Sequence, residues 1–253
     1  MRTKGMKPAA MAVVMMLVAG TALGAEIYIK QTRKTDPVTI MGQTQPEKTE
    51  TMVSWYGKDR VRVDTGEETS IIVRGDKNVM YMINHTEMTY GEIPVGADFF
   101  GAIAGEAEDE ETKQAMDMAN QMAQSMMGSI QVKVTPTTEA KKVRNWNARK
   151  YLIEMSMGSM MKANSEAWAT EDIKVDPRLY YMAANAMMAG MGGLETLIKE
   201  MQKVKGIVVY QETKSEAMGA TMRMVEEVVE VGEKAAPAGA FDIPKGYKKG
   251  NAY

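Results

Sequence analysis

Cysteine is absent from this chain of 253 residues, histidine occurs once, and phenylalanine occurs three times. Without cysteine the fold holds no disulfide, so its stability depends on a packed core. With His85 as the single histidine, thiol catalysis and zinc sites built from histidine and cysteine are excluded. We therefore expect no enzyme, no catalytic residues, no cofactor and no metal site of this kind.

Two features leave room for other chemistry. His85 lies between two predicted strands, in the segment 84–87. We expect an exposed loop residue there, with a ligand contact as the alternative. A serine nucleophile assisted by lysine is also compatible with the composition, although no motif marks one, and no glycine-rich phosphate loop follows a strand.

Long hydrophobic runs are scarce, and the strongest one lies at the N-terminus. Arg2, Lys4 and Lys7 precede the uncharged run Ala9–Ala25, whose strongly apolar part is short. A membrane-spanning helix needs about 20 mostly apolar residues. The pattern predicts a cleavable secretory signal peptide over residues 1–25.

Small residues predict cleavage near Gly24 or Ala25, which would deliver the chain to the periplasm or the exterior. The residue that follows is Glu26, so no cysteine is available for lipidation, and we expect no lipid anchor and no membrane span after cleavage. The formal net charge of −2 becomes more negative once the basic leader is removed. A net negative charge does not attract the negatively charged phosphate backbone, so we expect no binding of nucleic acid.

The segment from Ile27 to Pro94 alternates apolar and polar residues and is interrupted by glycine, aspartate and asparagine, which predicts a meander of antiparallel strands. Strands return at 130–135, 148–157, 165–172 and 206–231, the last with a turn near Gly219. We expect a single domain over 26–247 and a polar tail over 248–253.

Two segments show helical spacing instead. Apolar residues recur on one face from Ala115 to Met126 and again from Tyr180 to Met201, where Asp176-Pro177 marks the helix start. Glycines near position 192 predict a break in the second helix. Runs of strands separated by helices, without strict alternation, predict an α+β fold.

Several motifs resemble an exported bacterial family, the domain of unknown function 4412. They are Trp55 with 57–62, Ser70-Ile71-Ile72, the segment 76–85, Thr89-Tyr90, and the ending 236–247. That family is similar to the LolA-like periplasmic lipoprotein carriers. The resemblance implies a strongly curved antiparallel sheet, or half-barrel, with helices packed across its concave face, and an apolar cavity between them. The family has no known catalytic residues, so the resemblance implies none for this chain.

Methionine is the most unusual feature, with 27 residues. Its flexible side chain suits an irregular core or an adaptable apolar groove. We expect a groove for a lipid-like ligand or an apolar segment of an envelope protein partner. The predicted groove residues are Met118, Met122, Met126, Tyr180, Met187, Met191, Leu194 and Ile198.

Two alternatives remain open. Methionine clusters such as Met155, Met157, Met160 and Met161 could instead present thioethers to Cu(I), a soft ion. The chain could also be a structural or stress-related envelope protein with no small ligand. A basic cluster around Trp146 is interpreted as a solvated strand edge, with an anionic head group as the alternative.

Overall fold

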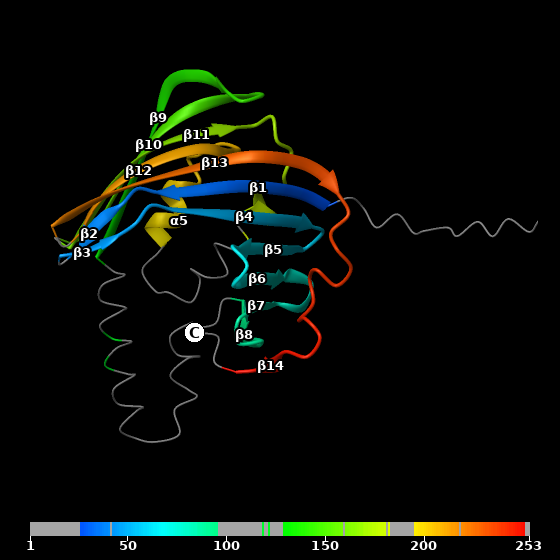
Figure 1. Ribbon diagram of the computed structural model, residues 1–253. Helices are drawn as coiled ribbons and strands as arrows, with labels where there is room; N and C mark the ends of the chain where they lie inside the picture. The colour runs from blue at the N-terminus through cyan, green and yellow to red at the C-terminus, as the bar shows by residue number, and fades with distance from the viewer. Residues whose placement is uncertain are drawn as a thin grey trace, which may run out of the picture.

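The structure is a computed structural model that describes residues 26–40, 42–95, 118, 121, 129–158, 160–180, 182, 195–217 and 219–250. Most of these residues form β-strands (Figure 1). The strands are β1 (Glu26–Thr35), β2 (Val38–Ile40), β3 (Gln43–Gln45), β4 (Lys48–Gly57), β5 (Arg60–Thr65), β6 (Thr69–Arg74), β7 (Val79–Asn84), β8 (Thr89–Pro94), β9 (Ile130–Val143), β10 (Trp146–Met157), β11 (Met161–Thr170), β12 (Ile207–Ala217), β13 (Ala220–Lys234) and β14 (Lys248–Lys249). The described helices are α3 (Pro177–Tyr180) and α5 (Glu195–Met201), with a 3₁₀ turn at Gly75–Lys77.

Twelve of the described strands form one sheet in the order β14-β8-β7-β6-β5-β4-β1-β13-β12-β11-β10-β9, and β2 pairs with β3 as a separate ribbon. Neighbouring strands are antiparallel, except that β14 runs parallel to β8. The long strands β9–β13 arch over one side of the molecule and the shorter β5–β8 continue along another, so the sheet bends around the side on which α5 lies (Figure 1). The meander predicted from Ile27 to Pro94 is confirmed.

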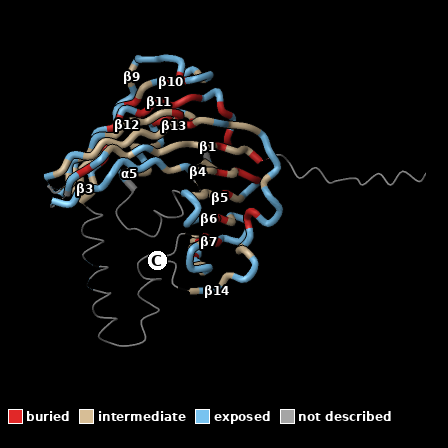
Figure 2. The backbone as a smooth tube through the Cα atoms, in the orientation of Figure 1, coloured by how far each residue is buried: buried red, intermediate tan, exposed pale blue. Residues whose placement is uncertain are grey.

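The two faces of the sheet differ sharply in burial. On β11, Ala163, Ser165 and Ala167 are buried, whereas the alternating Lys162 and Glu166 are exposed. Because side chains alternate between faces along a strand, this part of the sheet has one face in the core and one face that meets water. We call the face of Ala163 and Ala167, which α5 approaches, the inner face, and the opposite one the outer face. Figure 2 shows buried positions recurring along the middle strands while the hairpin ends are exposed.

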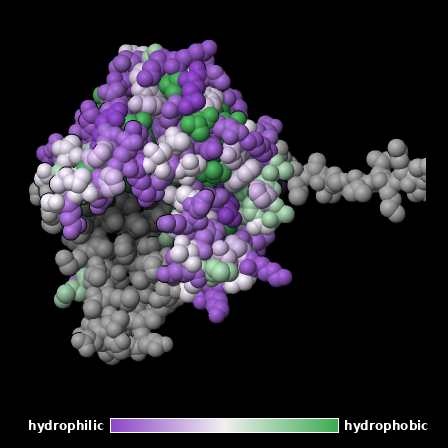
Figure 3. All heavy atoms as spheres, in the orientation of Figure 1, coloured by the Kyte–Doolittle hydropathy of each residue, from purple (hydrophilic) through white to green (hydrophobic). Residues whose placement is uncertain are grey.

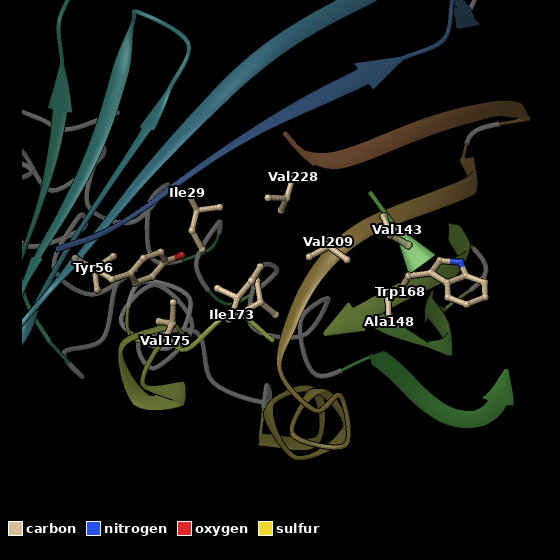
Figure 4. Close-up of a cluster of buried hydrophobic side chains, with 11 residues drawn as sticks. Ile29, Tyr56, Val143, Ala148, Trp168, Ile173, Val175, Val209 and Val228 are labelled. Atoms are coloured by element: carbon tan, nitrogen blue, oxygen red, sulfur yellow. The ribbon is translucent and has the colours of Figure 1, made fainter. Parts of the chain in front are cut away.

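Three clusters of buried side chains lie on the inner face, and the smallest is formed by Val73, Met80 and Ile93 of β6–β8. The first joins Ile29 and Tyr56 of the N-terminal strands to Val209 and Val228, and includes Ile173 and other residues before α3 (Figure 4). Burial raises the pKa of Tyr56 to about 12, so its hydroxyl stays neutral. The second cluster lies under β9–β11 and receives side chains from α5. Its buried members are Val132, Val134, Tyr151, Ile153, Ala167, Ala169 and Val204.

The start of α3 is formed as the sequence predicts. Asp176 accepts a hydrogen bond from the backbone N–H of Arg178 through Oδ1 at 2.8 Å, and Pro177 takes the first helical position. Proline is favoured there because its missing N–H would have no partner in the first turn. The capping carboxylate also pairs with the Arg178 guanidinium at 2.7 Å.

The α+β prediction, with helices packed across a concave face, is wrong. The described residues are nearly all sheet, and the two described helices span four and seven residues. The strands are longer than the sequence indicated: β9 runs to Val143, where only 130–135 was expected. The helix predicted over 115–126 lies outside the described residues, apart from helical backbone at Met118 and Gln121.

A C-terminal segment, residues 236–250, covers the outer face of β5–β8, and we call it the clasp. Phe241 and Ala240 are buried against Ile72 and Ile83. Lys248 and Lys249, assigned to the polar tail by sequence, pair with β8 as strand β14. The clasp thus encloses a second, smaller core on the side opposite α5.

No helix among the described residues is long and apolar enough to cross a membrane. The predicted signal peptide, residues 1–25, lies outside the described part of the chain. The first described residue, Glu26, is buried and only 5% exposed. Its carboxylate accepts hydrogen bonds from Arg60 and from the backbone N–H of Ala236, each at 3.0 Å.

Candidate functional site

Five methionines lie on the inner face near the turns that join β10 to β11 and β12 to β13. Strand pairing places Met157 opposite Met161, and it places Met155 opposite Ala163. Each member of the group is half-buried. We call this group the methionine band, and its members are Met155, Met157, Met161, Met222 and Met224.

Small side chains separate these methionines. Ala163 and Ser215 lie between Met155 and Met222 in the same cross-strand row, and Ala217 lies between Met161 and Ala220. On the β9 side the neighbours are larger, since Met155 pairs with Val132 and Met157 pairs with Ile130, and Met155 packs against the second core cluster. The band thus joins the core along β9 and has small neighbours along β11 and β12, and its unbranched thioether chains can adapt to different apolar partners.

The described members of the predicted groove occupy different places. Met118 is 68% exposed. The ring of Tyr180 is 6.2 Å from that of Tyr56, centroid to centroid, in the first core cluster. Ile198 is half-buried on α5, whose Leu197 packs in the cluster that also receives Met155. Met122, Met126, Met187, Met191 and Leu194 lie outside the described residues, so the groove they were to form stays a prediction.

Sequence reasoning missed a hydrogen-bonded network on the outer face. Ser70 Oγ lies 2.5 Å from Asp64 Oδ1 and 2.7 Å from His85 Nε2, and His85 Nδ1 lies 2.8 Å from the hydroxyl of Tyr247. A carboxylate only accepts, so the single Ser70 proton points to Asp64, and His85 Nε2–H donates to Ser70. The remaining ring nitrogen then accepts from Tyr247, which is the arrangement of a neutral imidazole.

Arg62 completes this network and ties it to the clasp. Its guanidinium donates to Asp64 at 2.6 Å, to Ser70 at 3.0 Å and to the carbonyl oxygen of Ala240 at 2.8 Å. Burial lowers the pKa of His85, and the nearby Arg62 charge lowers it further. The expectation of an exposed loop histidine is therefore wrong, because the ring is half-buried and both nitrogens are bonded.

The network does not have the arrangement of a nucleophilic triad. Asp64 contacts Ser70 directly, whereas a catalytic relay needs the carboxylate on the histidine and the histidine as the base for serine. Ser70 is only 2% exposed and directs its proton to a carboxylate. These groups are suited to fixing Tyr247 and Ala240 of the clasp on the sheet.

A cavity of about 510 Å³ lies between the clasp and the outer face. Trp55 and the Arg62–Asp64 pair line its sheet side, and Pro237 and Pro244 line its clasp side. The Arg62 donors that face this region are already bonded within the protein. The cavity thus presents the Trp55 indole and two proline rings, and the bonded Arg62 guanidinium offers few free hydrogen-bond donors to it.

Three basic residues of the cluster around Trp146 have partners within the chain. Arg144 pairs with Glu227 at 2.7 Å, and Lys150 pairs with Glu166 at 3.1 Å. The ammonium of Lys141 lies 3.9 Å from the ring centroid of Trp168. In the view of Figure 3, polar side chains predominate over the outer surface of the long strands and hydrophobic ones are scattered.

Among the described residues, no group of three or more histidine, cysteine, aspartate or glutamate side chains could hold a metal ion. Several acidic groups are instead engaged in ion pairs and hydrogen bonds within the chain. Glu212, for example, pairs with Arg223 at 2.9 Å, and this contact lowers the pKa of the carboxyl.

No family model matches the chain, and no curated protein matches it. The resemblance to the domain of unknown function 4412 is therefore not confirmed by a family match. Among solved structures, the chain is similar to PNGF-II, with 15% identity and a TM-score of 0.38, covering 90% of this chain and 31% of that one. A putative outer membrane lipoprotein-sorting protein domain from Vibrio parahaemolyticus gives 7% identity and a TM-score of 0.26, covering 82% and 85%. At these TM-scores neither likeness carries an inference about fold or function.

Proposed function

We propose that the protein binds an apolar, lipid-like ligand on the methionine band. The observation that carries this proposal is the set of half-buried thioether side chains on one continuous stretch of inner face, separated by small residues. Burial of apolar surface contributes about 25 cal/mol per Å². A ligand that covers these side chains would therefore gain affinity without needing a fixed polar partner.

The composition of the band fits a ligand of variable shape. Methionine has three rotatable bonds and a polarizable sulfur, and its side chain adapts to different apolar partners. In the same region Ser165 and Thr213 hydrogen-bond to one another at 2.8 Å and so present little unsatisfied polarity. Binding without chemical conversion is the role we assign to this surface.

The test is displacement of a fluorescent fatty acid from the purified protein, combined with native mass spectrometry for a co-purified apolar molecule. The variant Met155→Gln/Met222→Gln places amides in the band and should weaken fatty-acid binding at least tenfold. The matched control is Met88→Gln/Met160→Gln, because these two methionines are 50% and 49% exposed. Equal binding by both variants, or no binding by the native chain in either assay, would disprove the proposal.

We also propose that the protein acts after export, as the leader over residues 1–25 indicates. The mature chain would then begin at Ala25 or Glu26. N-terminal sequencing of the protein from the periplasm or medium of an expressing bacterium tests this. Recovery of the chain only with the intact Met1 terminus, or only from the cytoplasm, would contradict export.

A further inference from the structure

We infer that the end of the β10–β11 hairpin holds a thioether site for Cu(I), formed by Met155, Met157 and Met161. The three side chains come from two adjacent strands and share the inner face. This goes beyond binding of an apolar ligand, because it requires the sulfur atoms themselves and not only their apolar surface.

Strand register brings the three residues together. Met157 and Met161 are direct cross-strand partners, so their Cβ atoms are about 5 Å apart. Met155 lies two residues before Met157 on the same face, and diagonal neighbours are about 7–8 Å apart. Each methionine side chain has three rotatable bonds, so the three sulfurs can converge on one ion.

Small side chains flank two of the three methionines on one side. Ala163, the partner of Met155, and Ala217, the partner of Met161 on the next strand, both have short side chains. On the β9 side the partners are the larger Val132 and Ile130, so the small side chains lie only toward β11 and β12. All three methionines are half-buried, which allows an ion to enter while excluding part of the surrounding water.

Met160 does not belong to this site, although the sequence groups it with the others. It lies in the hairpin turn, is 49% exposed, and lines a surface depression with Lys162 and Glu216. Lys162 is on the outer face, since it alternates with the inward Met161. Of the four methionines that are clustered in the sequence, three therefore lie on the inner face and one does not.

The chemistry favours a soft monovalent ion. Thioethers are neutral, soft ligands that select Cu(I), whereas carboxylates suit harder ions. The chain has no cysteine, so methionine supplies its only sulfur ligands. A site of neutral thioethers does not lose protons on binding, which makes its affinity nearly independent of pH between 5 and 8.

The experiment is an anaerobic titration of the full chain with Cu(I) under ascorbate, read by withdrawal of Cu(I) from its coloured bicinchoninate complex and by native mass spectrometry. We expect one Cu(I) per chain, and at least tenfold weaker binding by Met155→Leu/Met157→Leu/Met161→Leu. The control Met222→Leu/Met224→Leu should retain native affinity. Native affinity in the triple variant, or no uptake by the native chain, would overturn the inference.

The leucine substitutions also distinguish copper binding from binding of the proposed apolar ligand. It keeps the apolar volume of methionine while removing the sulfur, so the triple leucine variant should still bind the fluorescent fatty acid within about twofold of the native chain. Retained fatty-acid binding also shows that the variant is folded. If the triple variant loses Cu(I) binding and keeps fatty-acid binding, the result supports the copper site. If it loses fatty-acid binding and keeps Cu(I) binding, the result overturns the site.

Discussion

At the scale of single residues, Ser70 is the point on which the outer-face network depends. It bonds Asp64, His85 and Arg62 at once while 2% exposed. Removing one partner of a buried polar group leaves the others unsatisfied, which costs about 1–3 kcal/mol. We predict that Ser70→Ala lowers the free energy of unfolding by about this amount in urea denaturation. Thr69→Ala, at the exposed neighbouring position, should stay within about 0.5 kcal/mol, and an equal loss in both variants would contradict the prediction.

The protonation of His85 gives a second prediction at this scale. Burial holds the pKa of His85 below its ordinary value of 6.5. The unfolded chain therefore takes up this proton first as the pH falls, so the stabilisation by neutral His85 is present above pH 6.5 and is lost below it.

Because the chain has one histidine, its NMR signal needs no assignment by mutation. The imidazole Cε1–H signal should titrate with a midpoint below pH 6.5. Between pH 6.5 and 5 the free energy of unfolding should fall less in His85→Gln than in the native chain, because the variant lacks this titrating group. A midpoint above 6.5 would mean that Asp64 dominates over burial and Arg62.

At the scale of elements, α5 protects the free edge of the sheet. β9 is the last strand in the order, and an edge strand exposes unpaired N–H groups. The carboxylate of Glu200 in α5 accepts a hydrogen bond from the backbone N–H of Val134 through Oε2, at 2.7 Å. Lys203 and this N–H both lower the pKa of the Glu200 carboxyl, with Lys203 the larger cause. The carboxylate thus substitutes for a missing neighbouring strand.

We predict that Glu200→Ala accelerates hydrogen exchange of the Val134 amide at least tenfold and promotes self-association through the β9 edge. The amide would lose its acceptor, and the edge would be open to another chain. Amide exchange by NMR and analytical ultracentrifugation provide the measurements. Thr196→Ala, an exposed position on the same helix, serves as the control. Unchanged exchange at Val134 would show that α5 shields the edge in another way.

Elements with strong local signals were predictable from the sequence, and those that depend on distant partners were not. Alternation with turn residues indicated the N-terminal meander, and Asp176-Pro177 indicated α3. The network around His85 was missed because Ser70 and Tyr247 are 15 and 162 positions away in sequence. Only strand register and the docking of the clasp bring them together. The methionine clusters showed helical spacing in places, but Met155, Met157 and Met161 share a face because they alternate along strands.

At the scale of the whole molecule, one continuous sheet has two differently covered halves. Inner-face clusters underlie both halves. On the outer face, the clasp covers β5–β8, whereas no described segment covers β10–β12, whose outer positions are mostly charged or polar, with Leu152 and Trp168 as apolar exceptions. The sheet therefore depends on the clasp in one half only, and the central β1, which pairs with β4 and β13, separates the halves.

Phe241 is the side chain on which the clasp depends most. It is 5% exposed in the cluster with Ile72 and Ile83, and the Arg60 guanidinium lies 4.4 Å from its ring centroid. Arg74 also holds the adjacent backbone, since it donates to the carbonyl oxygen of Phe241 at 3.1 Å. Truncating a buried phenylalanine to alanine costs about 3–5 kcal/mol.

We predict that Phe241→Ala lowers the free energy of unfolding by about this amount and that the loss is local. Hydrogen exchange should rise in β6–β8, which lose their cover, while β10–β12 keep native protection. Lys245→Ala, an exposed position in the same segment, should change neither. If β10–β12 lost protection equally, the sheet would unfold as one unit, and the clasp would support the whole inner face, including the methionine band, rather than one half of the molecule.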